Sequence, residues 1–317
     1  MKGLTDIPGV LVGHASDYDG LTGCTAILCE GGAVGGVDIR GSATGTEEMD
    51  LLNPMHFTDR IHAVVLAGGS AFGLEAASGV RRFLEHKGVG FQTPAAKVPL
   101  VPCAIIYDLA LGKSSARPTR EMGESAAAAA SNKAVEEGAV GVGTGATVGK
   151  VYGMKNAMKS GVGTATVPIA GDVLVSALAA VNALGDVIDP LTGKIVAGAR
   201  IAPDSNEFAG TAGVMKRGAR TGAAHQNTTL VVVATNARLS KVGATKLAQG
   251  GSAGMARSLS PVWTTFDGDL VIALSCGSVE ADINVLCVAA AEAVSQAILR
   301  AVRLAPGMGG VPGLKSR

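Results

Sequence analysis

Pairs of glycine divide this chain into short apolar runs, and this spacing constrains the fold more than any other feature of the sequence. The pairs include Gly31-Gly32, Gly35-Gly36, Gly68-Gly69 and Gly250-Gly251. Glycine accounts for 45 of the 317 residues, whereas only 3% are aromatic. Glycine permits tight turns and close approach of one backbone to another. We therefore expect a core of alanine, valine, leucine and isoleucine in closely packed sheets and helices.

The apolar runs and their periodicity predict a mixture of strands and helices. Runs rich in β-branched residues predict seven buried strands, at residues 24–28, 63–66, 104–107, 161–167, 173–181, 229–234 and 270–274. Helical periodicity predicts helices at residues 71–86, 121–137, 241–257 and 280–303. Ser70 and Ser240 precede two of these helices and are expected N-caps. The chain is therefore expected to be an α/β protein.

Charge and cysteine content narrow the class of protein. The chain has 27 Lys+Arg against 26 Asp+Glu and no basic cluster, which argues against nucleic acid or an anionic membrane as a partner. Its first ten residues lack the apolar core of a signal peptide. The longest uncharged apolar stretch, residues 173–185, is too short to span a bilayer. Five cysteines, an odd number, indicate reduced thiols, so we expect a cytoplasmic protein.

Several common kinds of site find no support in the sequence. The five histidines have no HxH or HExxH spacing and there is no CxxC pair, so we expect no metal. The glycine-rich segment 141–150 ends in Lys150, but Val151 follows where a nucleotide-binding loop has Ser or Thr. No GxSxG elbow is present. The sequence therefore predicts an activity that needs no cofactor.

Two polar clusters, each beside an apolar strand, remain as candidates for chemistry. Asn227-Thr228-Thr229 lies between the polar, glycine-rich segment 203–226 and a predicted strand. We expect that segment to be an exposed loop, which is a natural place for processing. Asp267 and Asp269 precede another strand, and alternate residues of an extended segment project on the same face. Each cluster alone is typical of an ordinary turn.

Five longer motifs carry a resemblance to a known family. They are TDIPGVLVGH at 5–14, AGGSAFGL at 67–74, GTGATVGK at 143–150, NALGD at 182–186 and NTTL at 227–230. Together they resemble the L-aminopeptidase/D-amidase family of self-cleaving N-terminal-nucleophile hydrolases. That family includes β-peptidyl aminopeptidases and nylon-oligomer (6-aminohexanoate oligomer) endo-hydrolases. The resemblance implies an αββα four-layer sandwich, a single hydrolase domain over residues 1–317, and assembly into a homotetramer.

The resemblance also implies that the chain cuts itself. Family members are made as one inactive chain, and the residue that becomes N-terminal after the cut is the nucleophile. Here the cut would separate Asn227 from Thr228 and give fragments 1–227 and 228–317. A threonine hydroxyl needs a base, and the freed α-amino group supplies one with a reference pKa of about 7.7–8.0. We expect the fragments to stay associated, because residues 229–234 would form a core strand.

Further roles follow from the same resemblance. Asp267 and Asp269 match the paired acids of the nylon-oligomer branch, where the peptidase branch has Ser-x-Glu, and would orient Thr228 and its amino group. Two close carboxylates split their pKa values, so one of them is expected to carry a proton, and the sequence does not assign which.

Three more residues match family positions. Lys150 would lie beside the nucleophile, Asn182 would hold the developing oxyanion, and Tyr107 would contact the oxyanion or the substrate. For Tyr107, a core aromatic with a satisfied hydroxyl is an equal alternative.

The sequence thus predicts an autoprocessed amide hydrolase that acts on linear amides such as 6-aminohexanoate oligomers or peptides. The first alternative is an aminopeptidase that releases N-terminal residues, including β-amino acids. The second is an acyl transferase resembling ornithine acetyltransferase, which self-cleaves before threonine on a related fold. The third is a degenerate scaffold without activity. Chain-length preference and endo against exo cleavage stay open at this point.

Overall fold

The structure is a computed structural model that describes residues 1–218 and 227–315. One long strand, β2 (Thr22–Ile39), organises its fold. The first part of β2 pairs with β1 (Leu11–Asp17) and β4 (Arg60–Ala67), and its last part pairs with β16 (Leu270–Val279). The register against β4 shifts between Leu28 and Ala33, and beyond this irregularity β16 replaces β1 as the neighbour on the other side of β2.

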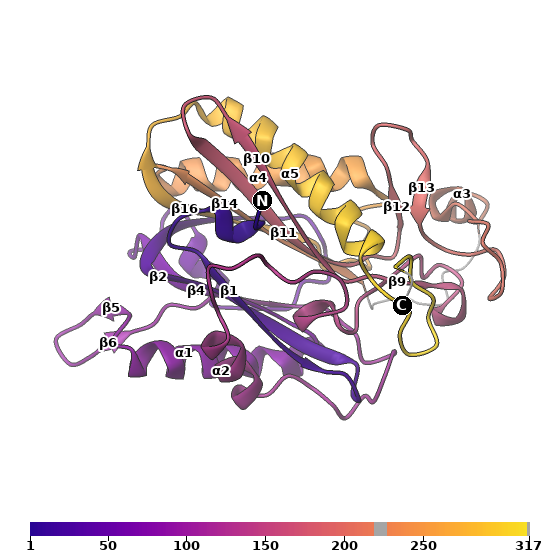
Figure 1. The fold of residues 1–317 in the computed structure, drawn as a ribbon, viewed down its shortest axis with the longest axis horizontal. Helices are drawn as coiled ribbons and strands as arrows, with labels where there is room; N and C mark the ends of the chain where they lie inside the picture. The colour runs from indigo at the N-terminus through magenta and orange to yellow at the C-terminus, as the bar shows by residue number, and fades with distance from the viewer. Residues whose placement is uncertain (219–226, 316–317) are drawn as a thin grey trace.

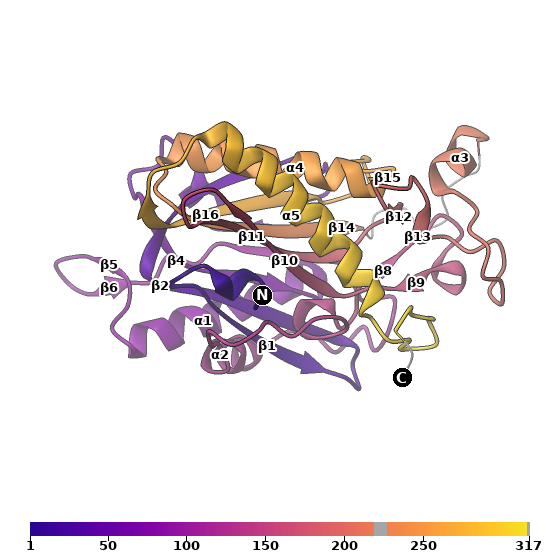
Figure 2. The same ribbon diagram turned by 45° about the horizontal axis from the view of Figure 1, so that its top comes forward.

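Two β-layers lie face to face between two layers of helices (Figures 1 and 2). The first β-layer contains β10 (Val162–Ile169), β11 (Val173–Asn182), β14 (Thr228–Ala237) and β16, and it is covered by α4 (Lys241–Ser258) and α5 (Ile283–Arg303). The second contains β1, the start of β2, β4, β7 (Cys103–Ile105) and β3 (Thr46–Glu47), and it is covered by α1 (Glu75–His86) and α2 (Arg120–Ala128). This arrangement is the expected αββα sandwich.

The side chains of β14 show why the layers pack in this order. Val231 and Val233 belong to the core cluster beneath α4 and α5, whereas Leu230 and Val232 belong to the cluster between the β-layers. All four are fully buried. Because strand side chains alternate between faces, a strand covered on both sides needs apolar residues at successive positions. A third cluster fills the space between the second β-layer and α1 and α2.

The four predicted helices are present, with corrections at their ends. Ser240 is the expected N-cap of α4, and its side chain accepts a hydrogen bond from the Gly243 N–H. The prediction for Ser70 is wrong, because Ser70 has a positive φ of 54° and begins a 3₁₀ helix that precedes α1. Helix α2 ends well before residue 137, because Ser131 exchanges two backbone hydrogen bonds with Val12 of β1.

Short elements complete the fold near the junction of β11 and β14. They are β8 (Thr147–Val148), β9 (Met158–Lys159), β12 (Asp186–Ile188), β13 (Ile195–Ala197), α3 (Thr211–Lys216) and β15 (Leu259–Ser260). The hairpin of β5 (Phe91–Gln92) and β6 (Lys97–Val98) lies at the other end of the molecule (Figure 1). Helix α3 falls inside the segment 203–226 that was expected to be a loop throughout. Residues 219–226 of that segment lie outside the described residues.

Helix α5 is the one described helix with the length and hydropathy of a membrane span. However, 67% of its most apolar stretch is buried inside the protein. Leu286, Ala290 and Val294 belong to the cluster that also contains residues of β11 and β14. Its apolar character is therefore accounted for by packing on the first β-layer.

Candidate active site

The strand order brings three of the predicted segments together at one end of the first β-layer. Thr228 is the first residue of β14, and it pairs with Asn182, the last residue of β11. On the other side of β14, the segment that leads into β16 carries Asp267 and Asp269, and Asn227 forms a parallel bridge with Asp267. These residues are all buried, with Thr228 only 3% exposed. The neighbourhood implied by the sequence motifs is therefore present in the structure.

Backbone N–H groups and one hydroxyl fix the two carboxylates. Asp269 accepts hydrogen bonds from the backbone N–H of Thr229 at 2.6 Å and of Trp263 at 3.3 Å. Asp267 accepts from both the hydroxyl and the backbone N–H of Thr264, at 2.5 and 3.1 Å. Asp269 therefore fixes the backbone of Thr229 at the start of β14, and Asp267 is itself fixed by Thr264 and by the Leu184 N–H at 3.4 Å.

Burial changes the proton affinity of this group of residues. Burial and the neighbouring Asp267 carboxylate raise the pKa of Asp269 to about 7. Burial also raises the pKa of Asp267, but the Thr264 hydroxyl and the nearby Lys150 oppose that change. Burial lowers the pKa of Lys150 to about 7, and attraction to Asp267 and Asp269 opposes that decrease. Asp267 accepts three hydrogen bonds, one of them from a hydroxyl, and Asp269 accepts two, so Asp269 is the member of the pair that binds a proton more readily.

Lys150 and Asn182 form a second polar unit beside Thr228. The Lys150 ammonium donates to both the backbone oxygen and the side-chain Oδ1 of Asn182, at 2.9 and 2.8 Å. The N–H of Thr147 also donates to Oδ1, and Asn182 Nδ2 donates to the backbone oxygen of Tyr107 at 3.0 Å. Tyr107 therefore meets this unit through its main chain. Tyr107, Thr147 and Lys150 are among the residues that line a small pocket.

The carbonyl of Asn227 is held from two sides. It accepts a hydrogen bond from the Gly268 N–H at 2.8 Å and from the Thr228 hydroxyl at 2.5 Å. A Cβ added at Gly268 would lie 2.7 Å from Thr228 Oγ1 and 2.7 Å from the backbone oxygen of Ala43, so only glycine fits there. The side-chain amide of Asn227 is buried, and neither of its polar atoms has a hydrogen-bond partner in the described part of the chain.

Sequence reasoning missed several residues that shape the site. Thr264 could have been found, because a threonine three residues before an aspartate is a common turn pattern. Gly268 lies inside the Asp-Gly-Asp pattern, but its contact with Asn227 depends on the bridge between distant segments. Lys159 is fully buried, and its ammonium donates to the carbonyls of Gly143, Ala146 and Ser160. It thereby fixes the loop that leads to Lys150.

Buried Asp108 braces the neighbouring segment. Its carboxylate accepts from the Thr22 hydroxyl and from the Gly69 N–H, both at 2.7 Å. No sequence motif had singled it out. Among residues 1–218 and 227–315, no group of three or more His, Cys, Asp or Glu side chains is arranged to hold a metal ion.

A strand-initiating threonine, a carboxylate pair and a lysine–asparagine unit on an αββα sandwich define an amide hydrolase with the N-terminal-nucleophile fold. The chain belongs to peptidase family S58, whose model matches residues 2–316.

Relatives and solved structures agree with this assignment. An uncharacterized aminopeptidase of Mycobacterium leprae is 38% identical over 98% of this chain and 93% of its own length. A 6-aminohexanoate-oligomer endohydrolase of Kocuria sp. is 31% identical over 87% of this chain and 75% of its own length. The same fold is found in the L-aminopeptidase D-Ala-esterase/amidase of Ochrobactrum anthropi, which is described as a variant of the Ntn hydrolase fold. The TM-score is 0.75 at 21% sequence identity, over 98% of this chain and 88% of that one. The same holds for a β-aminopeptidase of Burkholderia sp., with a TM-score of 0.72 at 22% identity over 99% and 91%.

Proposed function

We propose that the chain cuts itself between Asn227 and Thr228, and that the freed N-terminal Thr228 then hydrolyses linear amides. One observation carries this proposal. The Thr228 hydroxyl lies 2.5 Å from the carbonyl oxygen of Asn227, which also accepts the Gly268 N–H. The hydroxyl, the peptide group that it would attack and a donor for the developing negative charge thus lie side by side.

The cut would proceed through an ester. Thr228 Oγ1 attacks the Asn227 carbonyl carbon, and the oxygen that becomes negative keeps its hydrogen bond to the Gly268 N–H. The C–N bond breaks, and the Thr228 nitrogen takes up a proton from protonated Asp269. The Asp269 carboxylate regains a proton from the attacking Oγ1 hydroxyl, so the shift is neutral in protons. Water then hydrolyses the ester, which leaves a carboxylate on Asn227 and a free amine on Thr228.

The same residues would serve substrate turnover. The free amine of Thr228 accepts the hydroxyl proton, with a reference pKa of about 7.7–8.0. Oγ1 attacks a substrate amide to give an acyl-enzyme and an amine product, and water releases the acid. Asp267 stabilises the ammonium form of Thr228, and Asn182, oriented by Lys150, lies opposite Thr228, where it can hold the oxyanion.

The sheet order supports continued association of fragments 1–227 and 228–317. Strands β14 and β16 belong to the small fragment and are neighbours in the sheet. They lie between β11 and β2, which belong to the large fragment. The small fragment could leave only by exposing the cores on both faces of the sheet. Assembly into a homotetramer remains a prediction from the family resemblance, and light scattering on purified protein would measure it.

Two substrate classes are supported by the sequence motifs and by the relatives. The paired acids favour the nylon-oligomer branch, and a relative that covers 87% of this chain is a 6-aminohexanoate-oligomer endohydrolase. The 38% identical relative named an aminopeptidase favours removal of N-terminal residues. Cleavage of aminoacyl p-nitroanilides compared with N-capped internal amides separates the two. We place linear amides with internal bonds first, because of Asp267 and Asp269.

Mass spectrometry of matched variants tests the proposal. Wild type should give two fragments, the smaller beginning TTLVVV, whereas Thr228→Val should stay as one inactive chain. Thr229→Val is the matched control, because the buried Thr229 hydroxyl has no partner in the described part of the chain. It should be cut normally. An uncut wild type, or amide hydrolysis by Thr228→Val, would contradict the proposal.

A further inference from the structure

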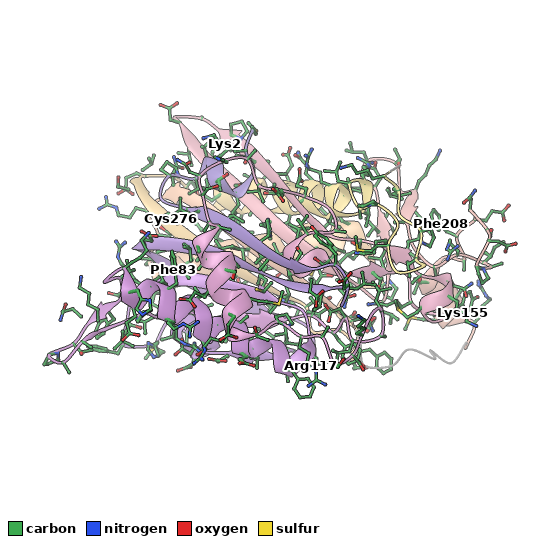
Figure 3. All side chains as sticks on the ribbon, turned by 60° about the horizontal axis from the view of Figure 1, so that its bottom comes forward. Lys2, Phe83, Arg117, Lys155, Phe208 and Cys276 are labelled. Atoms are coloured by element: carbon green, nitrogen blue, oxygen red, sulfur yellow. The ribbon has the colours of Figure 1, made fainter. Side chains whose placement is uncertain are left out.

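Two thiols from distant parts of the chain meet on neighbouring strands. Sγ of Cys29 on β2 lies 4.0 Å from Sγ of Cys276 on β16. Cys29 is 3% exposed and belongs to the core between the β-layers, and Cys276 packs against that core from a partly exposed position. Cys276 lies toward the opposite end of the molecule from Lys155 and Phe208 (Figure 3). Along β16, Cys276 lies six residues beyond Leu270, which pairs with Leu230 at the Thr228 end of β14, so the pair is separate from the Thr228 cluster.

The strand pairing holds the two thiols in place. Ser275, next to Cys276, pairs with Val34 of β2, and Cys29 lies in the irregular stretch of β2 just before it. A disulfide requires an S–S distance of about 2.05 Å, so the sulfurs must approach by about 2 Å. Rotation of the side chains about Cα–Cβ moves a sulfur by more than that amount. We therefore expect side-chain rotation to bring the two sulfurs to bonding distance.

The two cysteines lie on opposite sides of the proposed cut. Cys29 belongs to fragment 1–227, and Cys276 belongs to fragment 228–317. The contacts of the other three cysteines stay within one fragment. Cys24 and Cys103 lie together in the core beneath α1 and α2, within the large fragment. The Cys287 thiol donates to the Lys246 carbonyl, and both residues belong to the small fragment.

We propose that Cys29 and Cys276 form an oxidation site that reacts with a low-molecular-weight disulfide, and that the bond formed joins the two fragments covalently. The joining of fragments rests on the proposed cleavage, whereas the oxidation itself does not.

The chemistry is two thiol–disulfide exchanges. The thiolate of Cys276, the more exposed residue, attacks one sulfur of the small disulfide and releases one small thiol. Cys29 then attacks Sγ of Cys276 and displaces the second small thiol. Two protein thiols are oxidised, one small disulfide is reduced, and the released thiols carry the two protons. The hydrogen bond to Cys276 and burial raise the pKa of the Cys29 thiol, so the second exchange is the slower one.

A denaturing gel run without reductant tests the proposal. Wild type is purified with reductant, freed of it and incubated with oxidised glutathione. We expect one band at the position of the uncut chain, which separates into two when reductant is added. Digestion should yield a disulfide-linked pair of peptides that contain Cys29 and Cys276. Cys29→Ala and Cys276→Ala should each give two bands, and Cys287→Ala, which removes another partly exposed thiol, should match wild type.

Several results would overturn the proposal. They are two bands from oxidised wild type, glutathione retained on Cys276 alone, or a link that survives Cys276→Ala. Thr228→Val separates this failure from failure of the cleavage. In that uncut chain, oxidation should still remove the two thiols of Cys29 and Cys276. If the two thiols are lost on oxidation but the wild-type chain is never cut, the oxidation site stands and only the proposed self-cleavage is wrong.

Discussion

Asn182 lies directly opposite Thr228 on the neighbouring strand, at the end of β11 where β14 begins. This register joins two motifs that are far apart in the sequence. It also links Thr228 to Lys150, because the Lys150 ammonium donates to Asn182 at both its backbone and side-chain oxygens. Strand pairing therefore sets the position of the nucleophile. The polar residues around it lie in the segments that adjoin the ends of β11, β14 and β16.

Replacing Asn182 should slow catalysis more than binding. Asn182→Ala removes the amide that would hold the oxyanion. It also removes the side-chain oxygen that accepts a hydrogen bond from the Lys150 ammonium. Loss of one oxyanion donor costs about 10²–10³ in kcat. Steady-state kinetics should show kcat falling by that order with a smaller change in KM. Asn236→Ala, at the far end of β14, is the control. A change confined to KM would argue against an oxyanion role.

Thr264 should set the pH range of activity through Asp267. The Thr264 hydroxyl bond lowers the pKa of Asp267, so Thr264→Val should raise that pKa and protonate more of the carboxyl at a given pH. We expect the acidic limb of the pH–rate profile to move to higher pH. The exposed neighbour Thr265→Val should leave the profile unchanged. A uniform fall in rate without a shift of the limb would show that Thr264 acts only on folding.

Gly268→Ala should delay self-cleavage. The added Cβ would lie 2.7 Å from Thr228 Oγ1, closer than side-chain carbons approach other atoms, so the hydroxyl or the Gly268 backbone must shift. We expect the rate of fragment formation to fall by more than about tenfold, equivalent to about 1.4 kcal/mol of barrier. Gly31→Ala is the control, because a Cβ there meets nothing within 4 Å. Time courses on a gel compare the two, and equal rates would rule out the close-contact argument.

Lys159 should make stability depend on pH. Burial lowers the pKa of Lys159 from 10.5 to about 7, so between these values the unfolded chain holds a proton that the folded chain releases. Its contribution to stability therefore rises with pH across that window. Lys159→Met should flatten the slope of unfolding free energy against pH by up to about 1.4 kcal/mol per unit.

Urea unfolding at several pH values measures this slope. Lys155→Met changes an exposed lysine nearby and serves as the control (Figure 3). It should keep the wild-type slope. The same slope in Lys159→Met and wild type would mean that Lys159 keeps its proton in the folded chain.

Much of the fold follows from local sequence, but the site follows from it only in part. The runs that became β11, β14 and β16 are apolar at nearly every position because both of their faces are buried. Such continuous apolar runs predict buried strands from the sequence alone. The local pattern marks Thr228, Asp267 and Asp269 as polar residues beside apolar strands, their roles follow from the family resemblance, and the strand pairing explains why they lie together.

Other features depend on long-range contacts that no local pattern contains. The end of α2 is set by hydrogen bonds between Ser131 and Val12, and the periodicity of the helix gives no sign of them. The Gly268 N–H reaches Asn227 only because two segments form a parallel bridge. Lys159 is buried because three carbonyls of a loop converge on it, and a lone lysine in a sequence reads as exposed.

The central position of β14 and β16 has a consequence for how such an enzyme can be made. Both strands come from the last third of the chain, yet the sheet is complete only when they lie between β11 and β2. Under the proposed cut, the precursor reaches this arrangement as a single molecule. After the cut, refolding from denaturant becomes an encounter between two polypeptides, so recovery would depend on protein concentration and the uncut parent would be the only efficient route to the working enzyme.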